Sequence, residues 1–196
     1  MSVENYTEQH DTEQHHRDKS SDRVLVVDDI FDDQAVVDSE LFFYGDFMWS
    51  YNNGSTDDDK DSVKFFFARA DESFKAQSIF DNFKLEMEKK NILRIDANPL
   101  EVFVNGQTYG LDGSLHMDNS MPYYYTLLYM VNSGDTSDIG DFLFQKPGEK
   151  ETTTINFKPG RFILFPSYWK HTGLAPKVKN KFRMTLAYKS MRVTFL

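Results

Sequence analysis

The chain has 196 residues, of which 40% are hydrophobic and 15% aromatic, and its formal net charge is −9. This length and composition predict one domain with its own hydrophobic core rather than two small ones. Because the chain contains no cysteine, disulfides, thiolate metal sites and cysteine nucleophiles are excluded. The acidic balance makes nucleic acid an unfavourable partner.

The first 21 residues differ from the rest, because they are polar and charged and nearly free of aliphatic side chains. Such a segment buries too little surface to offset its ordering entropy. We therefore expect a flexible tail at 1–21 and a single domain at 22–196. His10, His15 and His16 lie in this tail, where solvated side chains are a better expectation than a second metal site. The chain has neither an apolar secretory segment nor a run of 18 apolar residues, so a cytoplasmic protein without a membrane span is expected.

The region before residue 91 contains patterns typical of both helices and strands. Apolar runs indicate strands, whereas apolar residues three or four apart behind a capping residue indicate helices. The predicted elements are a strand at 23–28, a helix over 35–43 capped by Asp32 or Asp33, a surface loop at 52–59, a strand at 63–68 and a helix over 72–90.

From Ile92 onward the chain consists of short apolar or alternating segments separated by Gly, Pro and Asn. This pattern is typical of the strands of an antiparallel sandwich or barrel. The predicted strands are 100–104, 114–118, 123–131, 141–145, 152–157, 161–165 and 181–188. The fold class is therefore α+β and mainly β, with the helices first and an all-β half after them.

Outside the tail the chain has only two histidines, His116 and His171. Residues two apart in a strand face the same side, so His116 and Asp118 are predicted to point into one cavity, with Met117 on the opposite face. His171 can supply a third ligand there. Two imidazoles and one carboxylate on one face of an octahedron leave coordination sites open, which defines the facial triad of non-haem Fe(II) oxygenases.

Each of these residues also has an ordinary structural explanation. The pattern His-x-Asp is common by chance, and His116 alone is compatible with a packed histidine bonded to a nearby carboxylate. His171 alone is compatible with a polar residue in a turn before Gly173. The metal site therefore depends on the three residues taken together with the sequence around them.

Several further segments occur in a fixed order between residues 100 and 190. They are 109–118 around the first two ligands, 125–132 as a following strand, 140–144 as a turn into the next strand, 158–167 before the second histidine, and 171–176 with 181–186 as a final pair of strands. Together they resemble the Fe(II)/2-oxoglutarate-dependent oxygenases, in particular the prolyl-4-hydroxylase-like branch. The resemblance implies a double-stranded β-helix, or jelly roll, with the N-terminal helices packed on its major sheet.

The resemblance also implies that His116, Asp118 and His171 bind Fe(II), with 2-oxoglutarate and O2 as cosubstrates and ascorbate as an additional reductant. In this family a basic residue after the second histidine binds the distal carboxylate of 2-oxoglutarate. Arg183 fits this role, because a guanidinium pairs with a carboxylate bidentately. Thr185 lies two positions further on, and hence on the same strand face.

Other contacts to the cosubstrate remain open at the level of sequence. Lys181 and Lys189 lie an even number of positions from Arg183, so they are expected on the same strand face and are alternatives to it. A tyrosine often assists cosubstrate binding in this family, and the candidates are Tyr109, Tyr125 and Tyr129. Aromatic residues in strands are, however, more often part of a core than ligand contacts.

The expected function is a 2-oxoglutarate-dependent dioxygenase that hydroxylates a residue of a peptide or protein, with a prolyl residue as first candidate, and releases succinate and CO2. Asp141 and Met130 depart from the prolyl-hydroxylase pattern, where a glycine and a tyrosine are common, so the substrate class stays open. The alternatives are a small-molecule or nucleobase oxygenase of the same superfamily, a cupin-like metal protein and a non-catalytic jelly-roll binding module. Substrate contacts are expected from the loops at 52–62 and 133–138.

Overall fold

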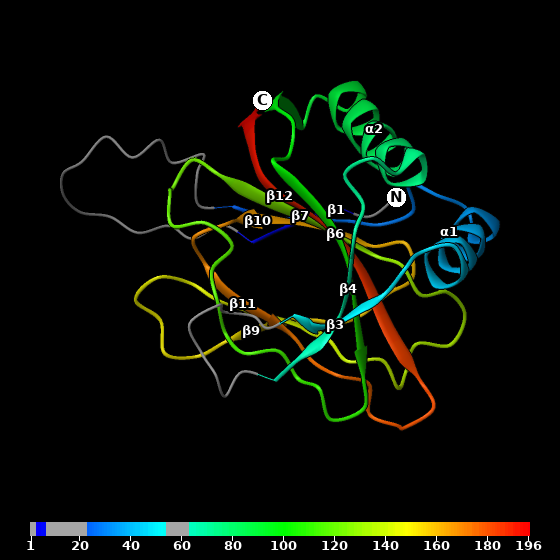
Figure 1. Ribbon diagram of the computed structural model, residues 1–196. Coiled ribbons are helices and arrows are strands. Elements are labelled where there is room, and N and C mark those ends of the chain that lie inside the picture. The colour runs from blue at the N-terminus through cyan, green and yellow to red at the C-terminus, as the bar shows by residue number, and fades with distance from the viewer. Residues whose placement is uncertain (1–2, 7–22, 54–62) are drawn as a thin grey trace.

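The computed structural model describes residues 3–6, 23–53 and 63–196. Within these residues the chain forms two helices and twelve strands (Figure 1). The helices are α1 (Asp33–Gly45) and α2 (Phe74–Lys89). The strands are β1 (Val3–Tyr6), β2 (Val24–Val27), β3 (Ser50–Asn53), β4 (Phe65–Arg69), β5 (Leu93–Ala97), β6 (Glu101–Thr108), β7 (Tyr125–Met130), β8 (Phe142–Gln145), β9 (Thr153–Ile155), β10 (Phe162–Pro166), β11 (Lys170–Gly173) and β12 (Phe182–Phe195).

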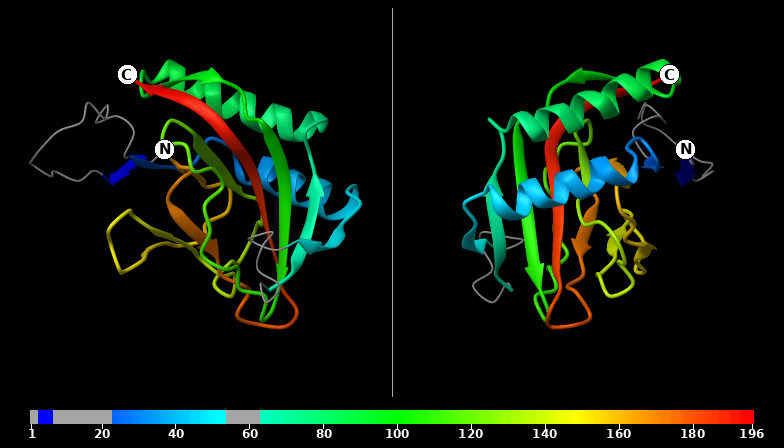
Figure 2. Two further views of the ribbon diagram at one scale, coloured as in Figure 1. Left: turned by 60° about the vertical axis from the view of Figure 1, so that its left-hand side comes forward. Right: turned by 90° about the vertical axis from the view of Figure 1, so that its right-hand side faces the viewer.

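The strands of the described residues form two antiparallel sheets. The larger sheet has the order β1-β2-β10-β7-β12-β6-β4-β3, and β5 pairs with the end of β12. The smaller sheet has the order β11-β8-β9, and a single bridge between His116 and His171 attaches one more segment to it. Both helices lie on the outer face of the larger sheet, and the smaller sheet lies opposite its inner face (Figures 1 and 2). The predicted jelly roll with helices on its major sheet is confirmed.

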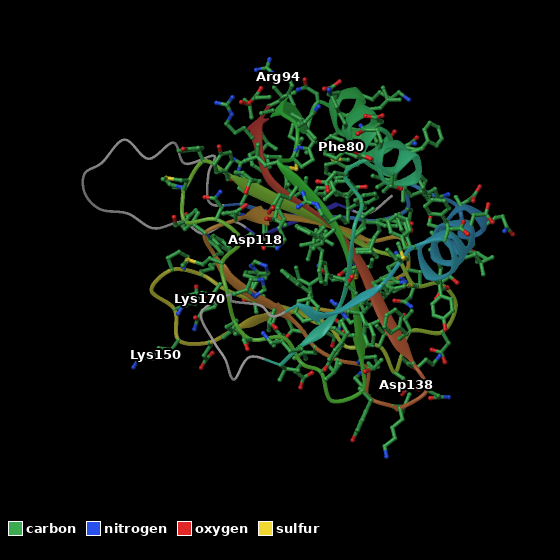
Figure 3. The ribbon with its side chains drawn as sticks, in the orientation of Figure 1. Phe80, Arg94, Asp118, Asp138, Lys150 and Lys170 are labelled. Atoms are coloured by element: carbon green, nitrogen blue, oxygen red, sulfur yellow. The ribbon has the colours of Figure 1, made fainter. Side chains whose placement is uncertain are left out.

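Successive side chains of the central strands point to opposite faces of the larger sheet, and those buried on each face form a separate core. On β7, Leu127 packs toward the helices, whereas Leu128 packs toward the smaller sheet. Phe80 of α2 belongs to the first core, and Asp118 lies on the other side of the sheet, between the two layers (Figure 3). The larger sheet is therefore buried on both faces at its centre, and its inner face can carry a site.

The helix termini follow local capping chemistry. The Asp32 side chain accepts a hydrogen bond from the backbone N–H of Ala35 at 2.8 Å, which confirms it as the cap of α1. Ser73 caps α2 in the same way through the N–H of Ala76. In the described part of the chain, no helix is long and apolar enough to cross a membrane.

Several elements differ from those predicted. β12 extends to Phe195, well beyond residue 188, because a bulge near Arg192 lets its end pair with β5. β5 and β11 were not predicted, and 114–118 forms one bridge instead of a strand. Residues 3–6 of the predicted tail form β1, which pairs with β2. The rest of that tail and most of the predicted loop at 52–59 lie outside the described residues.

Candidate metal centre

Backbone pairing brings the three predicted metal ligands together. His116 and Asp118 lie between β6 and β7, and His171 lies in β11. The N–H of His116 donates to the carbonyl of His171 at 3.1 Å, and the N–H of His171 donates back at 2.8 Å. The N–H of Asp118 donates to the carbonyl of Ser167 at 3.0 Å. Two segments distant in sequence are thus fixed in register, and His171 lies in a strand rather than a turn.

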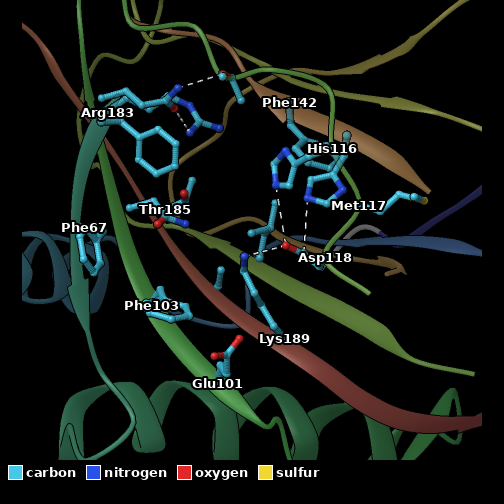
Figure 4. Close-up of a pocket in the computed structure, with 18 of the residues that line it drawn as sticks. Phe67, Glu101, Phe103, His116, Met117, Asp118, Phe142, Arg183, Thr185 and Lys189 are labelled. Carbon is cyan, nitrogen blue, oxygen red and sulfur yellow. Dashed lines mark hydrogen bonds and ion pairs between the residues drawn. The ribbon is translucent and has the colours of Figure 1, made fainter. Parts of the chain in front are cut away.

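The ligand atoms converge on one point. One atom each from His116, Asp118 and His171 can be chosen so that all three lie within 4.8 Å of one another. Nε2 of His116 lies 3.7 Å from Oδ1 of Asp118, and Nε2 of His171 lies 3.4 Å from Oδ2 (Figure 4). Met117, predicted on the opposite face, lines the same cavity instead, because its segment is not a regular strand. This convergence suits three ligands on one face of a single ion.

Both imidazole rings are oriented by backbone carbonyls. Nδ1 of His116 lies 2.9 Å from the carbonyl of Ser114, and Nδ1 of His171 lies 3.0 Å from that of Trp169. A carbonyl only accepts, so each Nδ1 carries the proton and donates it. Nε2 of each neutral ring is then left with its lone pair directed at the centre, as in other histidine metal sites.

The carboxylate of Asp118 is almost fully buried, since its side chain is 1% exposed. Its Oδ2 accepts a hydrogen bond from Oγ1 of Thr126 at 2.8 Å, and this hydroxyl lies 2.9 Å from Oγ of Ser167. Its Oδ1 faces Nζ of Lys189, which lies 2.6 Å away as an ion pair. A buried carboxylate that faces two imidazole nitrogens and is balanced by a cation fits a site for a metal cation.

The protonation states of the site also fit a metal. Burial, together with the repulsion from His171 in its protonated form, lowers the pKa of His116 to about 4. Burial by itself raises the pKa of Asp118, but the attraction of His171 in its protonated form and of Lys189 outweighs it, and the pKa lies well below its usual value. A neutral imidazole and an ionised carboxylate at neutral pH are the forms that bind a metal.

Arg183 lies in the same cavity with its guanidinium buried, since the residue is 3% exposed. Its Nε donates to the carbonyl of Gly140 at 3.0 Å, and Nη1 donates to Oε1 of Gln107 at 2.8 Å. No described carboxylate lies within ion-pair distance of it, and burial lowers its pKa to about 10. Three of its five N–H donors remain for an anion. A buried, fixed guanidinium without a carboxylate partner is suited to bind one.

Alternate residues of β12 connect Arg183 with the predicted metal ligands. Arg183, Thr185, Ala187 and Lys189 all line one cavity of about 560 Å³. Arg183 lies at one end of the cavity and Lys189 at the other, and His116 and Asp118 lie across from the strand (Figure 4). The cavity is therefore large enough for a metal and an anionic ligand together, and Arg183 and Thr185, the residues expected to bind 2-oxoglutarate, both line it.

The three candidate tyrosines do not line this cavity. Tyr125 and Tyr129 are buried in the core beneath the helices, on the face of β7 opposite Thr126 and Leu128. Tyr109 follows β6 and is 51% exposed. The expectation that one of them contacts the cosubstrate finds no support in their positions.

Two contributors were not identified from the sequence. Gln107 orients Arg183 and also donates from Nε2 to the carbonyls of Leu111 and Gly173. Thr126 donates a hydrogen bond to the carboxylate of Asp118, a predicted metal ligand. Alternation along β7 was a usable signal for Thr126, because it shares a face with Leu128. Gln107 gave no signal, since Gly173 and Arg183, which fix its role, are distant in sequence.

Comparisons with known proteins bear on the fold. No protein-family model matches the chain, and no curated protein matches it in sequence. Among solved structures, it is similar to a Trichoplax adhaerens prolyl hydroxylase in complex with a peptide fragment of hypoxia inducible factor (TM-score 0.62, 17% identity, 86% of this chain and 83% of that one). It is also similar to a Pseudomonas putida prolyl-4-hydroxylase (TM-score 0.61, 11% identity, 86% and 92%). A third is HygX of Streptomyces hygroscopicus with nickel and 2-oxoglutarate bound (TM-score 0.60, 13% identity, 86% and 82%).

At these identities the likeness defines the fold. The chain has the double-stranded β-helix of the 2-oxoglutarate and Fe(II) oxygenases, to which prolyl hydroxylases also belong. Within this fold it carries a His-Asp-His triad.

Proposed function

We propose that the protein is an Fe(II)- and 2-oxoglutarate-dependent dioxygenase that hydroxylates a residue of a peptide or protein. The observation that carries the proposal is the pairing of two features in one cavity. His116, Asp118 and His171 converge there, and the buried guanidinium of Arg183 lies at one end of it. A metal-binding triad alone suits many reactions, whereas a triad with a buried anion site suits a metal that shares its ligand sphere with a carboxylate cosubstrate.

The metal would be held by Nε2 of both histidines and by the carboxylate of Asp118. Fe(II) fits this set, because imidazole and carboxylate ligands retain it without the thiolates that the chain lacks. When bound, Fe(II) supplies the reaction of O2 with 2-oxoglutarate that releases succinate and CO2 and hydroxylates the substrate. Ascorbate is proposed only as a reductant that keeps the iron in the Fe(II) state.

Arg183 would bind the distal carboxylate of 2-oxoglutarate through its remaining N–H donors, with Thr185 beside it. Gln107 and the carbonyl of Gly140 keep the guanidinium in place before the ligand arrives. A preorganised guanidinium loses little freedom on binding, which favours affinity. The geometry thus orients the cosubstrate with its other end toward the triad.

The walls of the cavity limit water and side reactions. Leu128 and Phe142 line it, and the ring of Phe165 packs 4.6 Å from that of His171. Apolar walls next to reacting groups strengthen their electrostatic interactions and exclude water. They would protect the reaction at the metal centre until substrate covers the remaining opening.

A peptide substrate is supported by the outer part of the cavity. Phe65, Phe67 and Phe103 line it there together with the exposed side chains of Arg69 and Glu101. Aromatic rings flanked by one positive and one negative side chain suit a peptide in which apolar and polar groups alternate. The peptide-bound Trichoplax prolyl hydroxylase makes a prolyl peptide the first substrate to test.

The test is release of succinate from 2-oxoglutarate in the presence of Fe(II), O2 and ascorbate, with prolyl peptides, free amino acids and small molecules as substrates. Product is identified by mass spectrometry as substrate plus one oxygen. His116→Ala should abolish succinate release, and Arg183→Met should raise the 2-oxoglutarate concentration needed for half-maximal rate by about 100-fold. Unchanged succinate release by His116→Ala would refute the proposed function. A product only with small molecules would reassign the substrate class.

A further inference from the structure

The proposed metal ligand Asp118 already has a cation next to it. Nζ of Lys189 lies 2.6 Å from its Oδ1, and the carboxylate itself is 1% exposed. Lys189 is the last of the four cavity-lining residues on β12, and its side chain is 24% exposed. The ion pair is therefore shielded from solvent on the carboxylate side and open to the cavity on the ammonium side.

The ammonium and a metal would need the same carboxylate. Oδ2 of Asp118 accepts a hydrogen bond from the hydroxyl of Thr126 at 2.8 Å, and Oδ1 contacts Nζ of Lys189 at 2.6 Å. A divalent ion and an ammonium held on one carboxylate lie within a few ångströms of each other, and two positive charges at such a distance repel strongly where water is scarce.

A second carboxylate offers Lys189 an alternative partner. Glu101 lies directly opposite Lys189 in the β6–β12 ladder, so the two side chains share one face of the sheet. Both line the cavity, and Nζ of Lys189 lies 5.6 Å from the ring centroid of Phe103, on the neighbouring strand. Figure 4 shows Lys189 between Asp118 and Glu101. Directly opposite residues in a ladder have Cβ atoms about 4.5–5.5 Å apart, so the long side chain of Lys189 can reach toward either carboxylate.

We propose that Lys189 competes with the metal for Asp118 and moves to Glu101 when the metal binds. The inference rests on the proposed function, because the metal concerned is the one held by the triad. In this arrangement Lys189 stabilises the buried carboxylate of the metal-free protein and weakens metal binding. Glu101 restores part of the affinity by accepting the displaced ammonium. Half-occupancy of the site would then require a higher free metal concentration than the triad would require without Lys189.

Calorimetric titration with Mn(II) and with Ni(II), without 2-oxoglutarate, tests the proposal on the full chain. Lys189→Met should bind both ions at least about tenfold more tightly than the wild type, which corresponds to about 1.4 kcal/mol. Glu101→Gln should bind them about threefold more weakly. In the double variant, Glu101→Gln should have little effect, because no ammonium is left to be displaced. Lys181→Met, which removes the same charge near the start of β12, should match the wild type.

A second readout is the unfolding temperature, measured without and then with the metal. The metal-free Lys189→Met variant should unfold at a lower temperature than the wild type, because Asp118 then stays buried without its cation. Added Mn(II) should reverse this order of stability. A role of Lys189 only in packing would lower the unfolding temperature with and without the metal alike.

The outcomes separate the inference from the proposed function. If the wild type binds Mn(II) and Lys189→Met binds it equally well or more weakly, the competition is refuted and the metal site stands. If neither the wild type nor the variants bind a metal, the proposed function fails and the inference fails with it. If Lys189→Met does not fold, Glu101→Gln decides, and unchanged Mn(II) affinity in that variant refutes the inference.

Discussion

Gly173 at the end of β11 sets the position of Arg183. A Cβ atom built on Gly173 would lie 2.7 Å from Nη1 of Arg183 and 2.9 Å from both Cζ and Nη2. Ordinary contacts of a Cβ atom begin at 3.4 Å. In Gly173→Ala the guanidinium must therefore move by about 0.7 Å, the difference between 3.4 and 2.7 Å, or the strand must shift.

The movement has a cost because Arg183 is held on two sides. Its hydrogen bonds to Gly140 at 3.0 Å and to Gln107 at 2.8 Å leave little room for a displaced guanidinium. A shift of this size breaks the bidentate geometry with a carboxylate, and one hydrogen bond to a charged group contributes about 1.5–3 kcal/mol. Gly173→Ala should thus weaken 2-oxoglutarate binding by roughly 10- to 100-fold.

The assay is calorimetric binding of 2-oxoglutarate to the Mn(II)-loaded protein without O2, together with the 2-oxoglutarate dependence of succinate release. Gly45→Ala is the control, since a Cβ there meets nothing within 4 Å. Mn(II) affinity should be the same in both variants and the wild type. Unchanged 2-oxoglutarate affinity in Gly173→Ala would show that the cosubstrate carboxylate does not bind at Arg183.

Further predictions concern the surroundings of the triad and the core. Thr126→Val removes the hydroxyl that donates to Oδ2 of Asp118 and should weaken Mn(II) binding by about tenfold; equal affinity would show that this hydrogen bond does not support the ligand. Burial raises the pKa of Asp28, but its hydrogen bonds to Arg161 and a lysine outweigh burial and hold the pKa at about 2. Asp28→Asn should therefore lose roughly 2 kcal/mol of stability in urea unfolding at neutral pH, and in the wild type this contribution should disappear as the pH falls from 3.8 toward 2. The pKa of His116 is lowered from 6.5 to about 4, so the unfolded chain takes up that proton first, and the free energy of unfolding of the metal-free protein should fall as the pH decreases from 6.5 to 4. His116→Gln should flatten this dependence, and an equally steep curve in the variant would contradict it.

Much of the fold followed from local patterns. Capping by Asp32 and the helical spacing after residue 72 place both helices, and the alternation of apolar residues places most central strands. β11 was missed because four residues, three with polar side chains and one glycine, carry little signal by themselves. It exists because backbone pairing with β8 fixes it. Short strands of this kind are determined by tertiary partners rather than by propensity.

The sequence predicted those parts of the site whose chemistry restricts the residue type. It did not predict roles that depend on where a side chain lies in space. Only two histidines lie outside the tail, so His116 and His171 could be paired by elimination. The role of Lys189 could not be assigned in this way. Because Lys189 was predicted on the same strand face as Arg183, it was an alternative ligand for the cosubstrate. In the structure, its ammonium instead forms an ion pair with the carboxylate of Asp118. Which end of β12 lies next to Asp118 depends on the angle at which β12 crosses the other strands, and the local sequence does not determine that angle.

Anaerobic titration with Fe(II) and then 2-oxoglutarate tests the metal centre most directly. A complex in which 2-oxoglutarate binds Fe(II) absorbs weakly in the visible range through charge transfer between the two. The wild type should develop this band in a 1:1 ratio with added Fe(II), and Asp118→Ala, which lacks the carboxylate between the two histidines, should not. A wild type that develops no band at saturating Fe(II) and 2-oxoglutarate, or an Asp118→Ala variant that develops the same band, would contradict the assignment of His116, Asp118 and His171 as the iron site.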